Sequence, residues 1–203
     1  MKITILYDNP KPIRKGLQSD WGFAALVETP GNPTILFDTG GNGKILMCNM
    51  EILGINPKEI DEVFISHRHH DHIGGLTRFL KANDNVKIWL PAVMGIQLPN
   101  QRAVVVPDSL KMHAGIYSTG TLEGIEQSMA VETSHGLMLV VGCSHPRMEN
   151  ILSTASQFGK VYGIVGGLHS TPPESLQGLA LICATHCTQN KEAIQRMYPN
   201  AYQ

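Results

Sequence analysis

The chain has 203 residues, of which 42% are hydrophobic, and its formal net charge is −1. This length suits one compact domain over residues 1–203, or two small halves that share a core. The charge excludes a strongly basic nucleic-acid-binding surface, and no apolar run approaches the roughly 20 residues that span a bilayer. Four cysteines in a chain of this length do not form a disulfide framework. We therefore expect a cytoplasmic protein with reduced thiols and with neither a nucleic-acid nor a membrane partner.

The predicted elements begin with three strands and continue as strands alternating with helices. The turn PGN between the second and third strands predicts an antiparallel hairpin. Apolar residues at helical spacing predict the first helix, and Asn56 with Pro57 predicts the start of a second one. The predicted strands are 2–8, 22–29, 34–40, 62–66, 86–91, 128–133, 136–142, 161–167 and 180–187, and the other predicted helices are 43–54, 74–83, 148–159 and 190–199.

The stretch 92–118 consists of short apolar pieces divided by glycine and proline, and we predict no element in it. The rest of the chain mixes hairpins with strand–helix units. This order predicts an α+β fold of two mixed sheets with helices on the outside.

One short loop, within EVFISHRHHDHIGGL, carries four histidines and an aspartate directly after a predicted strand. Its pattern is His67-x-His69-x-Asp71-His72. The first two histidines can chelate one ion, and the Asp–His pair can reach a second ion a few ångströms away. Such ligands suit Zn²⁺ first, and also Fe, Mn, Co or Ni. The alternative is a histidine-rich surface loop, which the preceding buried strand disfavours. His70 occupies an x position, and we interpret it as a flanking residue.

A pair of glycines, Gly74 and Gly75, follows this loop before the next predicted helix. Glycine adopts backbone conformations that other residues avoid. We therefore expect this pair to let the backbone turn tightly beneath the loop.

The motif SHRHHDHIGG resembles the H-x-H-x-D-H signature of the metallo-β-lactamase superfamily, and three further motifs follow the superfamily's order. TILFDTG resembles its early strand ending in aspartate, which implies that Asp38 orients the site. VVGCSHP and ICATHCT resemble its later histidine motifs, which implies that His145 binds the first ion and His186 the second. The resemblance thus implies a four-layer αββα sandwich. It also implies one ion on His67, His69 and His145 and another on Asp71, His72 and His186.

The pieces WGFAALVE, EQSMAVET, GCSHP, GGLHS and THCT resemble a narrower branch, the class II metal-dependent hydrolases. Some of its members are named as methanopterin-pathway dihydropterin ribofuranosylaminobenzene phosphate synthases, or as dihydropteroate synthase-like proteins. This likeness implies an enzyme with two divalent ions whose metal-bound hydroxide attacks a phosphoester, ester or lactone, with Asp71 and Asp38 as catalytic residues. The alternatives are a pterin-related synthase and a non-catalytic metal-bearing sensor of a small molecule.

The chain departs from the superfamily pattern in two places. Many members have an aspartate between the third and last histidine motifs that bridges both ions, but here His169 stands in that segment. A neutral imidazole offers one lone pair and cannot bridge as a carboxylate does. His169 is therefore predicted as a ligand of one ion, with substrate contact or a structural role as alternatives. The stretch between His72 and His145 is also shorter than in many relatives.

The remaining candidate residues lie near the later histidine motifs. Cys143 and Cys187 are predicted to be buried thiols, with zinc ligation as the alternative. Arg147 could contact an anionic group of a small-molecule substrate, or form a surface ion pair. Glu126 is assigned to the structure of the strand entry. The oligomeric state does not follow from any of these motifs.

Overall fold

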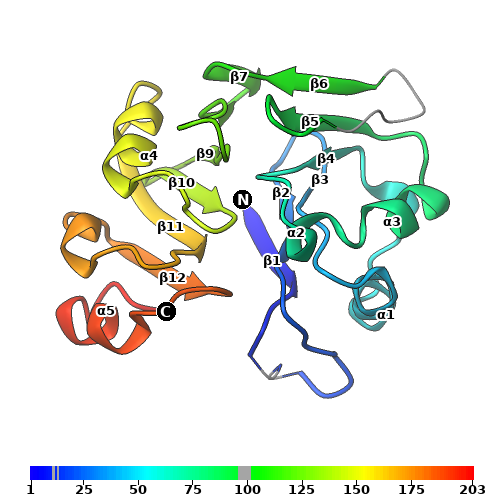
Figure 1. Ribbon diagram of the computed structural model, residues 1–203, viewed down its shortest axis with the longest axis horizontal. Helices are drawn as coiled ribbons and strands as arrows, with labels where there is room; N and C mark the ends of the chain where they lie inside the picture. The colour runs from blue at the N-terminus through cyan, green and yellow to red at the C-terminus, as the bar shows by residue number, and fades with distance from the viewer. Residues whose placement is uncertain (11, 13, 96–101) are drawn as a thin grey trace. The chain divides into compact units, whose positions relative to one another are not determined.

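The computed structural model describes residues 1–10, 12, 14–95 and 102–203. Within them the chain forms two compact units, residues 1–105 and 106–203. The fold contains two mixed six-stranded sheets with accompanying helices (Figure 1). The predicted α+β class with two mixed sheets is therefore confirmed. The prediction of one domain over the whole chain stays a prediction.

The first sheet has its strands in sequence order, β1 to β6. The predicted hairpin is present, because β2 pairs antiparallel with both β1 and β3. Strands β3, β4 and β5 then run parallel, so their carboxyl ends lie at the same edge. The strands are β1 (Lys2–Tyr7), β2 (Ala24–Glu28), β3 (Ile35–Phe37), β4 (Glu62–Phe64), β5 (Lys87–Pro91) and β6 (Ala103–Val106).

Helices α1 (Gly43–Leu53) and α3 (Leu76–Ala82) belong to the first unit and contact each other. Leu46 of α1 and Phe79 of α3 are fully buried in one cluster with residues of the sheet, and other apolar side chains of the two helices pack against it partly buried. Asn42 caps α1 by accepting the backbone N–H of Lys44. The helix predicted to start at Asn56 is a single 3-10 turn, η1 (Pro57–Glu59), and a short helix α2 (His70–Ile73) precedes α3.

The second sheet has the order β12-β11-β10-β9-β8-β7. Neighbours from β7 to β10 are antiparallel, whereas β10, β11 and β12 are parallel. Helices α4 and α5 bury apolar residues in a cluster with these parallel strands. The elements are β7 (Leu110–His113), β8 (Ile116–Ser118), β9 (Met129–Thr133), β10 (Gly136–Val141), α4 (Met148–Ala155), β11 (Val161–Gly167), η2 (Pro173–Leu176), β12 (Leu181–Thr185) and α5 (Lys191–Met197).

Three strands, β6, β7 and β8, lie in the stretch for which we predicted no element. Each has only three or four residues, too few for a clear alternation of apolar and polar positions. Residues 96–101 of this stretch lie outside the described residues. None of the helices in the described ranges has the length and apolar character needed to cross a membrane.

Candidate metal centre

The histidine loop and Asp38 follow two neighbouring parallel strands of the first sheet, β4 and β3. The carboxyl ends of parallel strands are common places for ligand sites, because their loops converge there. The backbone ties the two loops together: the N–H of Asp38 donates to the Phe64 carbonyl, and that of Thr39 to the His72 carbonyl, both at 2.8 Å. The Thr39 hydroxyl donates to the same His72 oxygen at 2.9 Å.

The carboxylate of Asp38 is fully buried and holds both ends of the loop. Its Oδ1 accepts the Ser66 N–H at 2.7 Å. Its Oδ2 accepts the Ser66 hydroxyl and lies 2.7 Å from His72 Nδ1. The Ser66 oxygen in turn lies 2.9 Å from His67 Nδ1. One carboxylate thus positions His72 directly and His67 through a serine.

These contacts assign the proton positions on both rings. A serine hydroxyl has one hydrogen, and here it points to Asp38, so the Ser66 oxygen accepts from His67 Nδ1–H. His72 Nδ1 likewise donates to the carboxylate. In their neutral forms both imidazoles therefore have an unprotonated Nε2, which is the atom that binds a metal ion.

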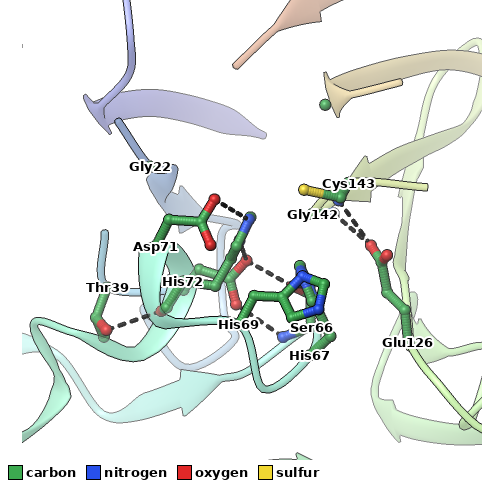
Figure 2. A network of polar contacts seen from close by, with 12 residues as sticks. Gly22, Thr39, Ser66, His67, His69, Asp71, His72, Glu126, Gly142 and Cys143 are labelled. Atoms are coloured by element: carbon green, nitrogen blue, oxygen red, sulfur yellow. Dashed lines mark hydrogen bonds and ion pairs between the residues drawn. The ribbon is translucent and has the colours of Figure 1, made fainter. Parts of the chain in front are cut away.

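The Nε2 atoms of His67 and His72 each lie close to a second atom that can bind a metal ion (Figure 2). His67 Nε2 lies 3.0 Å from His69 Nδ1, and His72 Nε2 lies 3.6 Å from Asp71 Oδ2. Two light-atom ligands on one tetrahedral zinc ion, each at about 2.0–2.1 Å, are about 3.3 Å apart. Both pairs are close to that separation, so this donor set fits metal binding. His70 begins α2 and is exposed.

The two glycines after the loop matter because they lack a side chain, and not because of their backbone angles. Gly74 has φ −61° and Gly75 has φ −83°, values that any residue adopts. A Cβ atom on Gly75 would lie 2.1 Å from the Thr39 carbonyl oxygen, and one on Gly74 would lie 2.3 Å from that of Gly41. The chain does turn at both glycines, as expected, but not in a conformation reserved for glycine. The absence of a side chain instead lets the loop lie against residues 39–41.

Substituting Gly75→Ala is expected to lower the free energy of unfolding by about 1–3 kcal/mol, because the methyl group displaces the Thr39 backbone. Urea unfolding followed by circular dichroism measures this. The control is Thr77→Ala on the exposed side of α3, for which a change within about 0.5 kcal/mol is expected. Equal unfolding midpoints for the two variants would contradict the close-approach role.

Three further histidines follow the parallel strands of the second sheet: His145 comes after β10, His169 after β11 and His186 after β12. His186 is buried, whereas His145 and His169 are partly exposed. The rings of His145 and His169 have centroids 5.2 Å apart. The Gln189 N–H donates to the His169 carbonyl at 2.9 Å and so ties the last two loops together. The second unit therefore brings its three predicted histidines to one sheet edge.

The buried carboxylate of Glu126 organises the loop that carries His145. Its Oε1 accepts the N–H groups of Gly142, Cys143 and Ser144 at 3.0, 2.9 and 3.2 Å, and its Oε2 accepts that of His145 at 3.0 Å. Figure 2 shows two of these contacts. A buried carboxylate needs such partners to offset its desolvation. The predicted structural role of Glu126 is thus the positioning of a candidate metal-binding loop.

Cys143 and Cys187 are both buried, at 3% and 8% exposure, and none of the four cysteines, all within the described residues, forms a disulfide. The Cys143 sulfur and a ring nitrogen of His186 lie within 4.8 Å of each other. A hydrogen bond with the Cys143 side chain lowers the pKa of the Cys187 thiol and outweighs the opposing effect of burial. Arg147 is exposed, and its Nε lies 3.6 Å from the Glu123 carboxylate, the geometry of a surface ion pair.

Left-handed backbone conformations concentrate at the candidate site. Among the described non-glycine residues, positive φ angles occur at Asp38 (55°), Ser144 (56°), His169 (44°), His186 (45°) and Glu123 (50°). Such conformations cost about 1–2 kcal/mol each for residues with a Cβ. Three of the five are predicted site residues, and a fourth directly precedes His145.

Two residues of this network, Ser66 and Glu126, were not predicted as site residues. Ser66 directly precedes the first histidine of the motif, and that adjacency was the available signal. Glu126 lies 19 positions before His145 in the chain. No local pattern indicates that it binds the His145 loop.

Comparison with known proteins identifies the family. Residues 22–136, more than half of the chain, match the metallo-beta-lactamase superfamily. The chain belongs to this superfamily, and the predicted resemblance is confirmed.

Two relatives come from Methanocaldococcus jannaschii. The chain is 25% identical to the 7,8-dihydropterin-6-methyl-4-(beta-D-ribofuranosyl)-aminobenzene-5'-phosphate synthase, over 93% of this chain and 87% of that protein. It is 23% identical to an uncharacterized protein, over 82% of this chain and 78% of that one. The alignment with the synthase spans 257 positions, more than the 203 residues of this chain. The synthase therefore contains segments that this chain lacks.

Two solved structures share the fold. A metal-dependent hydrolase of the beta-lactamase superfamily has a TM-score of 0.78 at 22% identity, covering 98% of this chain and 93% of that chain. The metallo-beta-lactamase fold protein YhfI from Bacillus subtilis has a TM-score of 0.68 at 13% identity, covering 99% and 94%. These likenesses show the fold and leave the reaction open.

Proposed function

We propose that this protein is a metal-dependent hydrolase of a small phosphoester, ester or lactone, using two divalent ions, Zn²⁺ first among the candidates. One observation supports it most strongly: the loop offers two donor pairs at 3.0 and 3.6 Å, with both buried imidazoles held in the metal-binding tautomer. Superfamily membership extends the proposal to the later histidines. His145 then joins His67 and His69 at the first ion, and His186 joins Asp71 and His72 at the second.

The ions, when bound, supply Lewis acidity and bring the pKa of a water molecule towards neutrality. The residues of the chain hold the ligand atoms in position. Asp38 fixes His72 directly and His67 through Ser66, so the ligand nitrogens are oriented before an ion arrives. Asp71, partly exposed, has a carboxylate oxygen beside His72 and would help to orient the attacking water. His169 is a candidate ligand or substrate contact near His145.

A second function, a pterin-related synthase, is favoured by the 25% identity to the Methanocaldococcus jannaschii synthase over 93% of this chain. The same metal centre would then activate a different small molecule. In either case the substrate is a small molecule, with an anionic group as one possibility. We also propose a location in the cytoplasm, where the four cysteine thiols would remain reduced.

The metal requirement is tested by His69→Ala, which removes one exposed donor and leaves the buried network intact. We expect an unchanged circular dichroism spectrum, loss of bound metal by elemental analysis and at least a 100-fold loss of turnover. His70→Ala is the matched control, since His70 is an exposed neighbour outside both donor pairs. A metal-free protein with full activity would show that the hydrolase mechanism is wrong.

The two candidate functions are separated by substrate. Metal-loaded protein is assayed on generic phosphodiesters, esters and lactones, and in parallel on a pterin pyrophosphate with an aminobenzoate. Turnover of the first set supports the hydrolase, and formation of a carbon–nitrogen bond in the second supports the synthase. Tight binding of a small molecule without turnover would instead indicate a sensor.

A further inference from the structure

The segment between His145 and His186 contains no aspartate to bridge two ions, and its two acidic residues are Glu149 and Glu174. Both glutamates are exposed. Glu149 accepts a hydrogen bond from the Ser175 hydroxyl at 2.6 Å, between helix α4 and the turn η2. Neither glutamate belongs to the loops that carry the histidines. This segment therefore offers no carboxylate in place of the bridging aspartate, and an anionic ligand beyond the proposed Asp71 would be another kind of side chain.

A cysteine sulfur lies close to His186, the histidine proposed to bind the second ion. The Cys143 sulfur is within 4.8 Å of a ring nitrogen of His186, and both side chains are buried, at 3% and 4% exposure. A tetrahedral zinc ion with a Zn–S bond of about 2.3 Å and a Zn–N bond of about 2.0 Å holds the two atoms about 3.6 Å apart. The upper limit of 4.8 Å on the observed separation is compatible with that distance.

The backbone at both residues is fixed in place. The Cys143 N–H donates to Glu126 Oε1 at 2.9 Å, within the same set of contacts that holds His145. Gly167 ends β11, which lies between β10 and β12, the strands that Cys143 and His186 follow. A Cβ atom on Gly167 would lie 2.5 Å from the Gly142 oxygen and 3.2 Å from the His186 ring. This close packing leaves little room for the backbone at Cys143 and His186 to move at the edge of the second sheet.

We infer that the Cys143 thiolate is a ligand of the ion that His186 binds, in place of the carboxylate that bridges the ions in many superfamily members. The inference rests on the proposed function. On ligation the thiol proton passes to solvent and a sulfur–metal bond forms. A thiolate is a soft ligand, so the site selects Zn²⁺ or Co²⁺ over Mn²⁺ and Mg²⁺.

The neighbouring thiol of Cys187 is not equivalent. Its sulfur lies 3.9 Å from the Cys143 carbonyl oxygen and would be 2.7 Å from a Cβ on Gly167, so it packs between backbone segments. It is buried to a similar degree, at 8% exposure against 3% for Cys143. Cys187→Ser is therefore the matched control for Cys143→Ser.

The test uses the full chain, freed of metal with a chelator and titrated with Co²⁺. Wild type and Cys187→Ser are expected to develop a thiolate-to-cobalt charge-transfer band in the near ultraviolet. Cys143→Ser is expected to lose the band. Zinc-edge X-ray absorption of the wild type needs no variant and should show one sulfur at about 2.3 Å.

Each result decides between the proposals. Cobalt binding without a thiolate band in the wild type overturns the inference and leaves the hydrolase proposal standing. A band that persists in Cys143→Ser assigns the thiolate to another cysteine and also overturns it. Absence of any cobalt or zinc binding overturns the inference and the proposed function together. If Cys143→Ser does not fold, the X-ray absorption measurement decides.

Discussion

Asp38→Ala is expected to lower the free energy of unfolding by about 3–5 kcal/mol and to weaken metal binding by about 10- to 100-fold. The carboxylate is fully buried and accepts two hydrogen bonds from Ser66 and one from His72. Alanine leaves three buried donors without their acceptor. It also frees both imidazoles to turn and to change tautomer. Urea unfolding measures the first effect, and competition with a chromophoric chelator measures the second.

Asp38→Asn separates the two effects. Its amide keeps the shape of the carboxylate and can still accept the Ser66 N–H, so most of the stability should remain. The NH₂ group facing His72 Nδ1 would move the ring proton to Nε2, and metal affinity should fall as far as in the alanine variant. Asp61→Ala is the control, because that exposed carboxylate accepts a single N–H, from Thr34. Unchanged metal affinity in both Asp38 variants would contradict the orienting role.

Glu126→Ala is expected to cost about 3–5 kcal/mol of unfolding free energy, because four backbone N–H groups lose a buried anionic acceptor. The His145 loop should then lose its fixed conformation. Hydrogen exchange measured by mass spectrometry should show faster exchange over residues 142–145, and chemical denaturation gives the stability change.

The matched control is Glu132→Gln, at an exposed glutamate that accepts one hydrogen bond from the Tyr117 hydroxyl at 2.6 Å. We expect it to change stability by less than about 1 kcal/mol. If Glu126→Ala left exchange over residues 142–145 as slow as in this control, the carboxylate would not be what holds the loop.

The sequence predicts well what local pattern encodes. The long strands β10 and β11 are nearly continuous apolar runs, helices α1 and α4 carry apolar residues at helical spacing, and each lies within its predicted range. The strands β6 to β8 are too short for a period, and their pairing partners stabilise them. The helix expected at Asn56 is one turn only, because Ile60 and Asp61 already lead into the next strand.

The candidate site likewise has a part that the sequence predicts and a part that it does not. Its ligand types were predictable, because the histidine loop is contiguous and the later histidines follow recognisable strands. Its supporting contacts were not. The Ser66 link between Asp38 and His67 depends on which side the serine hydroxyl faces, and the Glu126 contacts join segments that only the folded sheet brings together. The glycine pair after the loop was predicted for the wrong physical reason.

The left-handed backbone at Asp38, His169 and His186 bears on how the protein would respond to laboratory evolution. At each position glycine or asparagine would relieve the conformational strain. A library selected for heat resistance alone would therefore accumulate changes at the two histidines, whereas Asp38 is retained for the three buried hydrogen bonds that its carboxylate accepts. Variants at the histidines would resist heat better while losing the imidazoles proposed to serve the metal ions. A thermostabilisation programme should hold these positions fixed and seek its gains elsewhere in the chain.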